Sequence, residues 1–123
     1  MPYIYPSVSE LQNTDKVGSG DCVPLVQIKA GAPLTAKWRE GAKVRGNARL
    51  PNGTAIATFE NGRYANRPTG NHAALYMGQN ALGILVMDQW KRKDKIRSRL
   101  IYFRGNGSGF DDSDNGDKFS VIE

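Results

Sequence analysis

The sequence predicts an α+β domain in which short helices come first and an antiparallel sheet follows. Two observations lead to this prediction. The first third of the chain carries helix start and stop signals, whereas the middle and the end carry short runs of β-branched and aromatic residues between glycine-rich turns. With 123 residues, of which 39% are hydrophobic, the chain is long enough to bury a core, and we expect one catalytic domain over residues 1–123.

Three short helices are expected, over residues 9–13, 21–30 and 35–42. The second is the best defined, because Asp21 suits the N-cap, Pro24 suits the first turn and Gly31 is a stop signal. In the third, Thr35 is the predicted N-cap and Trp38 the core anchor.

Strands are expected over residues 54–59, 72–77, 84–90, 96–104 and 119–122. If the turn between the second and third of these is centred on Asn80, the antiparallel pairing places His72 opposite Asp88 and Tyr76 opposite Ile84. Opposed side chains share one face of a sheet. The single histidine of the chain is therefore expected to face an aspartate, unless a one-residue bulge puts the two on opposite faces.

Cys22 is the only cysteine, which excludes an internal disulfide and a zinc site of several cysteines. At the start of a helix the backbone N–H groups and the helix dipole favour the thiolate. His72 can then act as general base and acid, and Asp88 can orient its ring, while the Cys22 N–H can donate to an oxyanion. The neighbouring Asp21 would oppose thiolate formation, so we expect its carboxylate to cap its own helix and point away from the sulfur.

Less specific interpretations of the same residues remain open. A lone cysteine can be inert core, a lone histidine can be structural, and Asp88 can simply end a strand. The net charge of +5 and the basic stretch over residues 91–104 could serve an anionic partner such as cell wall or nucleic acid. No nucleic-acid-binding motif accompanies that stretch, so nucleic acid is not expected, and charges that protect an edge strand are preferred. The acidic run over residues 111–116 departs from a calcium loop at Ile122, and neither a metal nor a cofactor is expected.

Three segments carry a resemblance to a known family: Asp21-Cys22 opening a helix, Gly70-Asn71-His72-Ala73 opening a strand, and Asp88-Gln89-Trp90 closing the next. Together they resemble the NlpC-type and CHAP superfamily of papain-like cysteine hydrolases. The segments 53–59, 70–76 and 115–123 further resemble a small Proteobacterial family associated with type VI secretion, whose members look like peptidoglycan amidase effectors.

The resemblance implies a papain-like NlpC/CHAP fold, with N-terminal helices packed on an antiparallel β-sheet, the cysteine at a helix N-terminus and the histidine on the sheet. It implies a cysteine amidase or endopeptidase that cuts amide bonds in the peptide stems of peptidoglycan, with Cys22, His72 and Asp88 as the triad. A tyrosine that many relatives place before the nucleophile helix has no assigned counterpart here.

Partners and location follow from the same resemblance. Peptidoglycan, a cognate immunity protein and a component of the secretion apparatus are implied as partners, whereas a membrane is not. No secretory signal and no apolar run long enough to span a bilayer are visible, so we expect synthesis in the cytoplasm and delivery to the periplasm of target cells. Two alternatives stay open: a non-catalytic binding module on the same fold, and a thiol hydrolase acting on another amide or acyl substrate.

Overall fold

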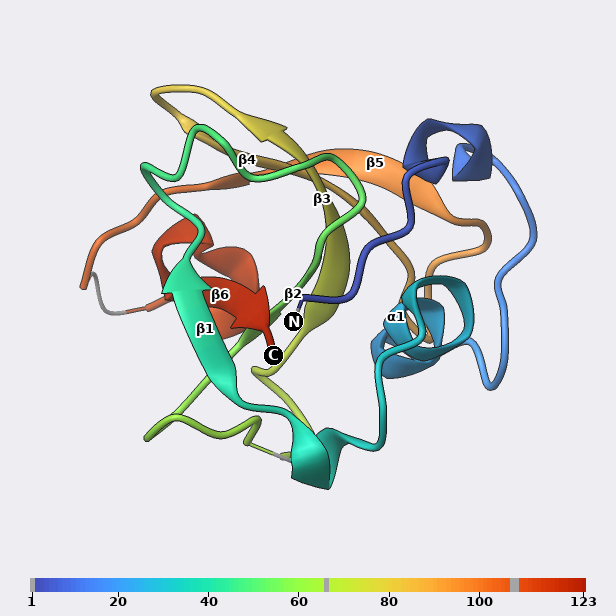
Figure 1. The fold of residues 1–123 in the computed structure, drawn as a ribbon, viewed down its shortest axis with the longest axis horizontal. Helices are drawn as coiled ribbons and strands as arrows, with labels where there is room; N and C mark the ends of the chain where they lie inside the picture. Colours follow the sequence, from blue (N-terminus) through green and yellow to red (C-terminus); the bar gives the residue numbers. More distant parts are fainter. Residues whose placement is uncertain (1, 66, 107–108) are drawn as a thin grey trace.

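Within residues 2–65, 67–106 and 109–123, which the computed structural model describes, six antiparallel strands form one sheet in the order β1-β6-β2-β3-β4-β5. Its strands are β1 (Glu40–Lys43), β2 (Ala55–Thr58), β3 (Ala73–Gln79), β4 (Gly83–Asp88), β5 (Arg97–Tyr102) and β6 (Phe119–Ile122). The helix α1 (Cys22–Ala30) lies beside β3 (Figure 1). Four 3-10 turns complete the described elements: η1 (Val8–Leu11), η2 (Thr35–Lys37), η3 (Asp112–Asp114) and η4 (Gly116–Lys118). The α+β class is confirmed.

One face of the sheet receives α1. Leu25 and Val26 of the helix are fully buried, and they belong to one apolar cluster with Ala73 and Leu75 of β3 and Ala57 of β2. The alanines allow the helix to approach the strands closely. Burying Leu25 alone contributes about 2 kcal/mol, so this face fixes the helix, and with it Cys22, against the start of β3.

The opposite face packs a second apolar cluster, formed by residues such as Ile56, Tyr76, Val86 and Phe119. Phe119 begins β6, which is the last strand in sequence but lies between β1 and β2 in the sheet. Figure 1 shows β6 beside β1, at the end of the sheet away from α1. Chain segments far apart in sequence thus meet at the centre of the fold.

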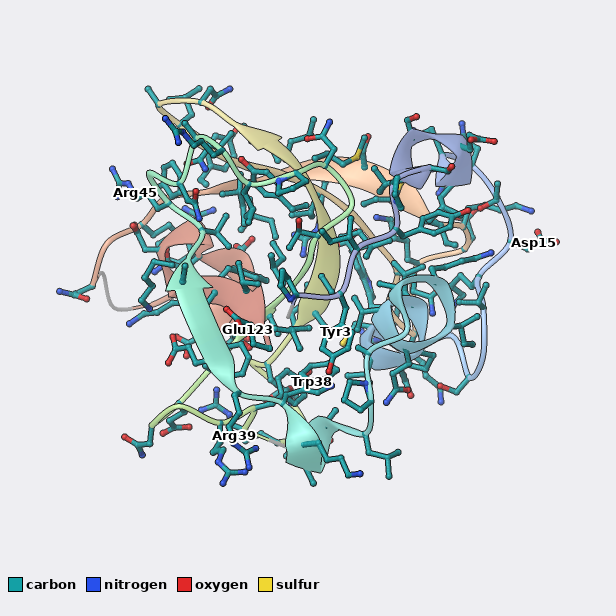
Figure 2. The ribbon with its side chains drawn as sticks, in the orientation of Figure 1. Tyr3, Asp15, Trp38, Arg39, Arg45 and Glu123 are labelled. Atoms are coloured by element: carbon teal, nitrogen blue, oxygen red, sulfur yellow. The ribbon has the colours of Figure 1, made fainter. Side chains whose placement is uncertain are left out.

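The predicted helix over residues 35–42 is wrong. It is replaced by the single turn η2 and then by β1, whose Glu40 pairs with Ile122 of β6. Trp38 is extended rather than helical, and its fully buried ring is fixed by a hydrogen bond of 2.8 Å from Nε1 to the Pro33 carbonyl. In Figure 2 it lies between β1 and α1. Pairing with a distant strand overrides the local helical preference here.

The β3–β4 hairpin differs from the predicted register in an informative way. Tyr76 pairs with Val86, not Ile84, and nearer the turn Gln79 pairs with Ile84. The register shifts between Tyr76 and Gly78, where β3 contains one extra residue. The pairing at the turn, continued without this bulge, would put His72 and Asp88 on opposite faces; the bulge returns them to the same face.

The remaining predicted strands occur within a few residues of their expected bounds. The first predicted helix is the 3-10 turn η1. The acidic run over residues 111–116 contains η3 and the start of η4, and residues 107–108 lie outside the described part. Among the described helices, none combines the length and the apolar character needed to cross a membrane.

Candidate active site

Cys22 is the first residue of α1, as predicted, with Asp21 at the N-cap position. The glycine-rich loop before it needs left-handed backbone at Gly20, where φ is +89°, which lets the chain turn sharply into the helix. Asp21 is exposed, and its carboxylate makes no capping hydrogen bond to its own helix; it accepts instead from the Ser19 hydroxyl at 3.2 Å. Asp21 therefore occupies the predicted N-cap position, but the predicted capping hydrogen bond of its carboxylate is wrong.

His72 directly precedes β3 and is anchored through its backbone. Its N–H donates to the Thr58 hydroxyl at 3.0 Å, and its carbonyl accepts the Thr58 N–H at the same distance. The side chain is buried, with its ring edge packed against Trp90 and Phe119 at centroid distances of 6.3 and 6.4 Å. The imidazole is thus held from three sides.

Asp88 ends β4 and meets His72, as the sequence predicts: His72 Nε2 lies 2.8 Å from Asp88 Oδ2. Its fully buried carboxylate also accepts from Arg99 Nε at Oδ2 and from Lys93 Nζ at Oδ1, each at 2.7 Å. An ionised carboxylate accepts at both oxygens, so Nε2 of His72 carries a proton. The nitrogen left for the thiol is Nδ1.

These contacts shift three pKa values. Burial alone would raise the pKa of the Cys22 thiol, but the hydrogen bond and charge of His72, with the Ala73 N–H and the Tyr64 hydroxyl, lower it overall. Burial likewise opposes a charged His72, yet Asp88 and Cys22 raise its pKa. For Asp88 the effect of burial is outweighed by His72, Arg99 and Lys93, which hold its pKa well below the usual range. The three groups favour a thiolate beside an imidazolium.

Tyr64, which sequence reasoning missed, lies beside the nucleophile position. Its hydroxyl is 3.8 Å from Cys22 Sγ, and its ring packs on Trp38 at a centroid distance of 4.8 Å. Burial and the Cys22 thiol raise the pKa of the Tyr64 hydroxyl, so it keeps its proton and remains a donor. It follows β2, far from the upstream position at which a tyrosine was sought; Tyr3 and Tyr5 instead pack against the core.

Gln89, Lys93 and Arg99 also escaped sequence reasoning as parts of the site. Lys93 and Arg99 stood in the basic stretch that was interpreted as edge-strand charge, and β5 is indeed an edge strand. Both cations flank the Trp90 ring, at 4.5 and 4.9 Å from its centroid, while they bind Asp88. Lys93 and Arg99 follow Asp88 closely along the sequence, on the short β4–β5 connection and on β5. This short separation was the signal that could have placed them beside Asp88.

The site opens into a cleft of about 1030 Å³. Cys22, His72 and Tyr64 lie on its wall with the cations Arg67, Lys91 and Arg92. A second hollow of about 420 Å³ adjoins it and shares His72 and Trp90 with the first. The two hollows therefore meet at the His72 and Trp90 side chains, and Cys22 lies on the wall of the larger one. No group of three or more histidine, cysteine or acidic side chains able to hold a metal ion occurs in the described part of the chain.

Known proteins resemble this chain over most of its length. The family model described as "Domesticated amidase effector 2" matches residues 6–122. A Salmonella typhi protein named "Type VI secretion amidase effector 2 protein" is 42% identical over 133 residues, with all of both chains covered. An Ixodes scapularis protein named "Domesticated amidase effector 2" is 36% identical over 111 residues, covering 87% of this chain and 73% of that protein.

The fold is shared as well. A solved structure named "Type 6 secretion amidase effector 2 (Tae2)" superposes with a TM-score of 0.89 at 40% identity, covering 98% of this chain and 94% of that one. Family match, sequence identity and fold lead to one conclusion: this chain belongs to the domesticated amidase effector 2 family.

Proposed function

We propose that this chain is a cysteine amidase that cleaves amide bonds in the peptide stems of bacterial peptidoglycan, and that it acts as an antibacterial effector of a type VI secretion system. The observation that carries the proposal is the contact series from Cys22 through His72 to Asp88 at the N-terminus of α1, opening into the cleft. The names of the relatives, which describe amidase effectors, support it. The papain-like NlpC/CHAP relationship is part of the same proposal, with residues 1–123 as one catalytic domain.

In the first step the Cys22 thiolate attacks the carbonyl carbon of the scissile amide, and a C–S bond forms as the carbonyl electrons move to oxygen. The Cys22 backbone N–H, which belongs to the first turn of α1 and so has no partner within the helix, and the Tyr64 hydroxyl are the donors that we assign to this oxyanion. Collapse of the intermediate breaks the C–N bond. The leaving amine takes its proton from Nδ1 of the His72 imidazolium, and a thioester remains on Cys22.

In the second step neutral His72 accepts a proton from water, and the hydroxide oxygen attacks the thioester. The C–S bond breaks, the carboxylic acid leaves, and the thiolate–imidazolium pair returns. Asp88 stays ionised in both steps and holds His72 in the tautomer that presents Nδ1 to the reacting atoms.

The charge of the cleft suits an anionic peptide. Arg67, Lys91 and Arg92 line the same cleft as Cys22, and stem peptides of peptidoglycan carry free carboxylates. A cognate immunity protein that blocks this cleft, and delivery to the periplasm of the target cell, belong to the proposed effector role.

The test is digestion of purified sacculi, with the soluble fragments identified by mass spectrometry. The intact protein should release fragments with newly cut peptide stems, and Cys22→Ala, at equal concentration and equal thermal stability, should release none. Undiminished cleavage by Cys22→Ala would refute a thiol mechanism. A folded intact protein whose Cys22 is reactive but which releases no fragments would point to another amide substrate.

A further inference from the structure

Gln89, which follows Asp88, is fully buried. All hydrogen-bonding groups of its side-chain amide bind the segment that leads into α1. Its Oε1 accepts the Val17 N–H at 3.0 Å, and its Nε2 donates to the Val17 carbonyl at 3.0 Å and to the Asp21 carbonyl at 2.6 Å. Both N–H hydrogens and the carbonyl oxygen are thereby satisfied by the loop that leads into α1. The last of these acceptors is the residue immediately before Cys22.

Strand geometry explains how two adjacent residues serve the two halves of the site. Successive side chains at the end of a strand point to opposite faces. At the end of β4 this directs Asp88 to the ring of His72 and Gln89 to the backbone before Cys22. The backbone at Asp88 and Gln89 therefore positions both His72 and the segment that precedes Cys22.

Apart from Gln89, the loop is held by the packing of Val17 against the apolar cluster and by a hydrogen bond of 3.2 Å from the Gly20 N–H to the Val17 carbonyl. Gly18 and Gly20 both occupy left-handed backbone, and the Asp21 side chain does not cap the helix. Lys16 Nζ adds bonds to the carbonyls of Trp90 and Lys91, at 3.1 and 3.0 Å, but these are exposed to solvent. Within the described residues Gln89 supplies the buried side-chain attachment of this loop to β4.

We propose that Gln89 is a positioning residue that sets the approach of the Cys22 thiol to Nδ1 of His72. The inference rests on the proposed cysteine amidase function. Gln89 does not reach substrate: the cleft is lined by Asp21 and Cys22, and Gln89 is not among the residues described on its wall. Its effect passes through the Asp21 carbonyl, one peptide unit from the nucleophile, and a shift of about 1 Å at a reacting atom can cost roughly 100-fold in rate.

The chain contains a matched control at the other end of the same hairpin. Gln79 clamps a second loop with the same chemistry: its Oε1 accepts the Gly46 N–H at 2.9 Å and its Nε2 donates to the Val44 carbonyl at 2.8 Å. The loop at Gly46 carries no residue of the candidate site. Gln79 is half-buried rather than fully buried, and Gln79→Met removes a clamp of the same chemistry remote from the candidate site.

The experiment compares Gln89→Met with Gln79→Met in the full chain. For each, kcat and KM on solubilised peptidoglycan stems are measured, and the Cys22 thiolate is titrated by its ultraviolet absorbance and by alkylation rate against pH. Gln89→Met should lower kcat by about 30- to 100-fold with KM changed less than about threefold, and should move the thiolate titration to higher pH. Gln79→Met should lose thermal stability, to a smaller extent because Gln79 is half-buried, and keep both kcat and the titration.

Equal behaviour of the two variants would overturn the inference and leave Gln89 a structural clamp like Gln79. If Gln89→Met does not fold, Gln89→Asn against Gln79→Asn decides the question. The shorter amide cannot span both Val17 and Asp21, so the same changes should appear at smaller size, and their absence refutes the role. Cys22→Ala distinguishes failure of the proposed function from failure of the positioning role. Full activity of Cys22→Ala would refute the proposed function itself. An inactive Cys22→Ala together with Gln89 variants of normal kcat and titration would refute the positioning role alone.

Discussion

Replacing Asp88 with asparagine tests the site most directly, because the two residues have the same shape. Asp88 Oδ2 takes the bonds from His72 and Arg99, and Oδ1 takes the bond from Lys93. An asparagine has one acceptor oxygen and one NH₂ group in these places. Each of its two orientations therefore fails in a different and measurable way.

If the asparagine oxygen faces His72, its NH₂ group meets the Lys93 ammonium, and two donors oppose one another. If it faces Lys93, the NH₂ group donates to Nε2 of His72, which forces the proton onto Nδ1 and removes the base that faces Cys22. Either orientation also leaves two cations beside a neutral group. Breaking a buried pair typically costs about 3–5 kcal/mol. The Arg99 and Lys93 side chains are 27% and 10% exposed. Since water reaches them, we expect about 2–4 kcal/mol, a fall in Tm of roughly 10 °C.

The loss of activity should exceed the loss of folded protein. At a temperature where Asp88→Asn remains folded, kcat/KM on solubilised stems should fall by roughly 10³-fold or more, since the wrong tautomer cannot take the proton. The control is Asp114→Asn. Asp114 also contacts Arg99, at 3.8 Å, but its side chain is 49% exposed and makes no described contact with His72. That change should cost less than about 1 kcal/mol and leave kcat/KM within about threefold. A folded Asp88→Asn with activity close to that of the unaltered protein would refute the assigned role of Asp88.

Three further results are expected. The lowered pKa of Cys22 and the raised pKa of His72 predict a bell-shaped pH profile of kcat/KM: activity appears as the thiol ionises, below its ordinary value of 9.0, and is lost as the imidazolium deprotonates, above its ordinary value of 6.5. A profile that rises only near the ordinary thiol value would contradict the ion pair. Tyr64→Phe, which removes the hydroxyl 3.8 Å from Sγ, should lower kcat by about 10- to 100-fold with Tm nearly unchanged, and an unaltered kcat would exclude Tyr64 from the oxyanion site. Gly53→Ala should cost more than about 3 kcal/mol by urea unfolding, because φ is +92° and a Cβ would lie 2.0 Å from the Tyr5 carbonyl oxygen. Gly46→Ala, with φ of +83° and open space, should cost only about 1–2 kcal/mol, and equal costs would refute the steric argument.

The sequence predicted the parts of the fold whose signals are local. Asp21, Pro24 and Gly31 bound the helix that begins at Cys22, and runs of β-branched and aromatic residues located five of the described strands, β2 to β6. The failure at residues 35–42 has a non-local cause, since Glu40 becomes a strand residue only through its pairing with Ile122. The residue pattern within 35–42 contains no information about this pairing with a distant strand.

The candidate site divides in the same way. The juxtaposition of His72 and Asp88 was predictable from strand parity, although the register was two residues off. A one-residue bulge was expected to separate the two side chains, whereas the bulge after Tyr76 leaves them on one face. Tyr64 was not predictable, because its place beside Cys22 depends on the fold of an irregular segment against Trp38. The bonds of Gln89 to the loop before Cys22 depend likewise on the path of that loop.

The position of β6 between β1 and β2 ties activity to residues 119–122. Cys22, His72 and Asp88 are all synthesised before Phe119, yet Phe119 packs against the His72 ring and its strand separates β1 from β2. A chain interrupted before residue 119 therefore contains every reacting group but lacks the strand that organises them. During synthesis the thiol and its base remain unassembled until this last strand has joined the sheet. Unfinished or clipped chains are consequently expected to be harmless to the cell that makes them.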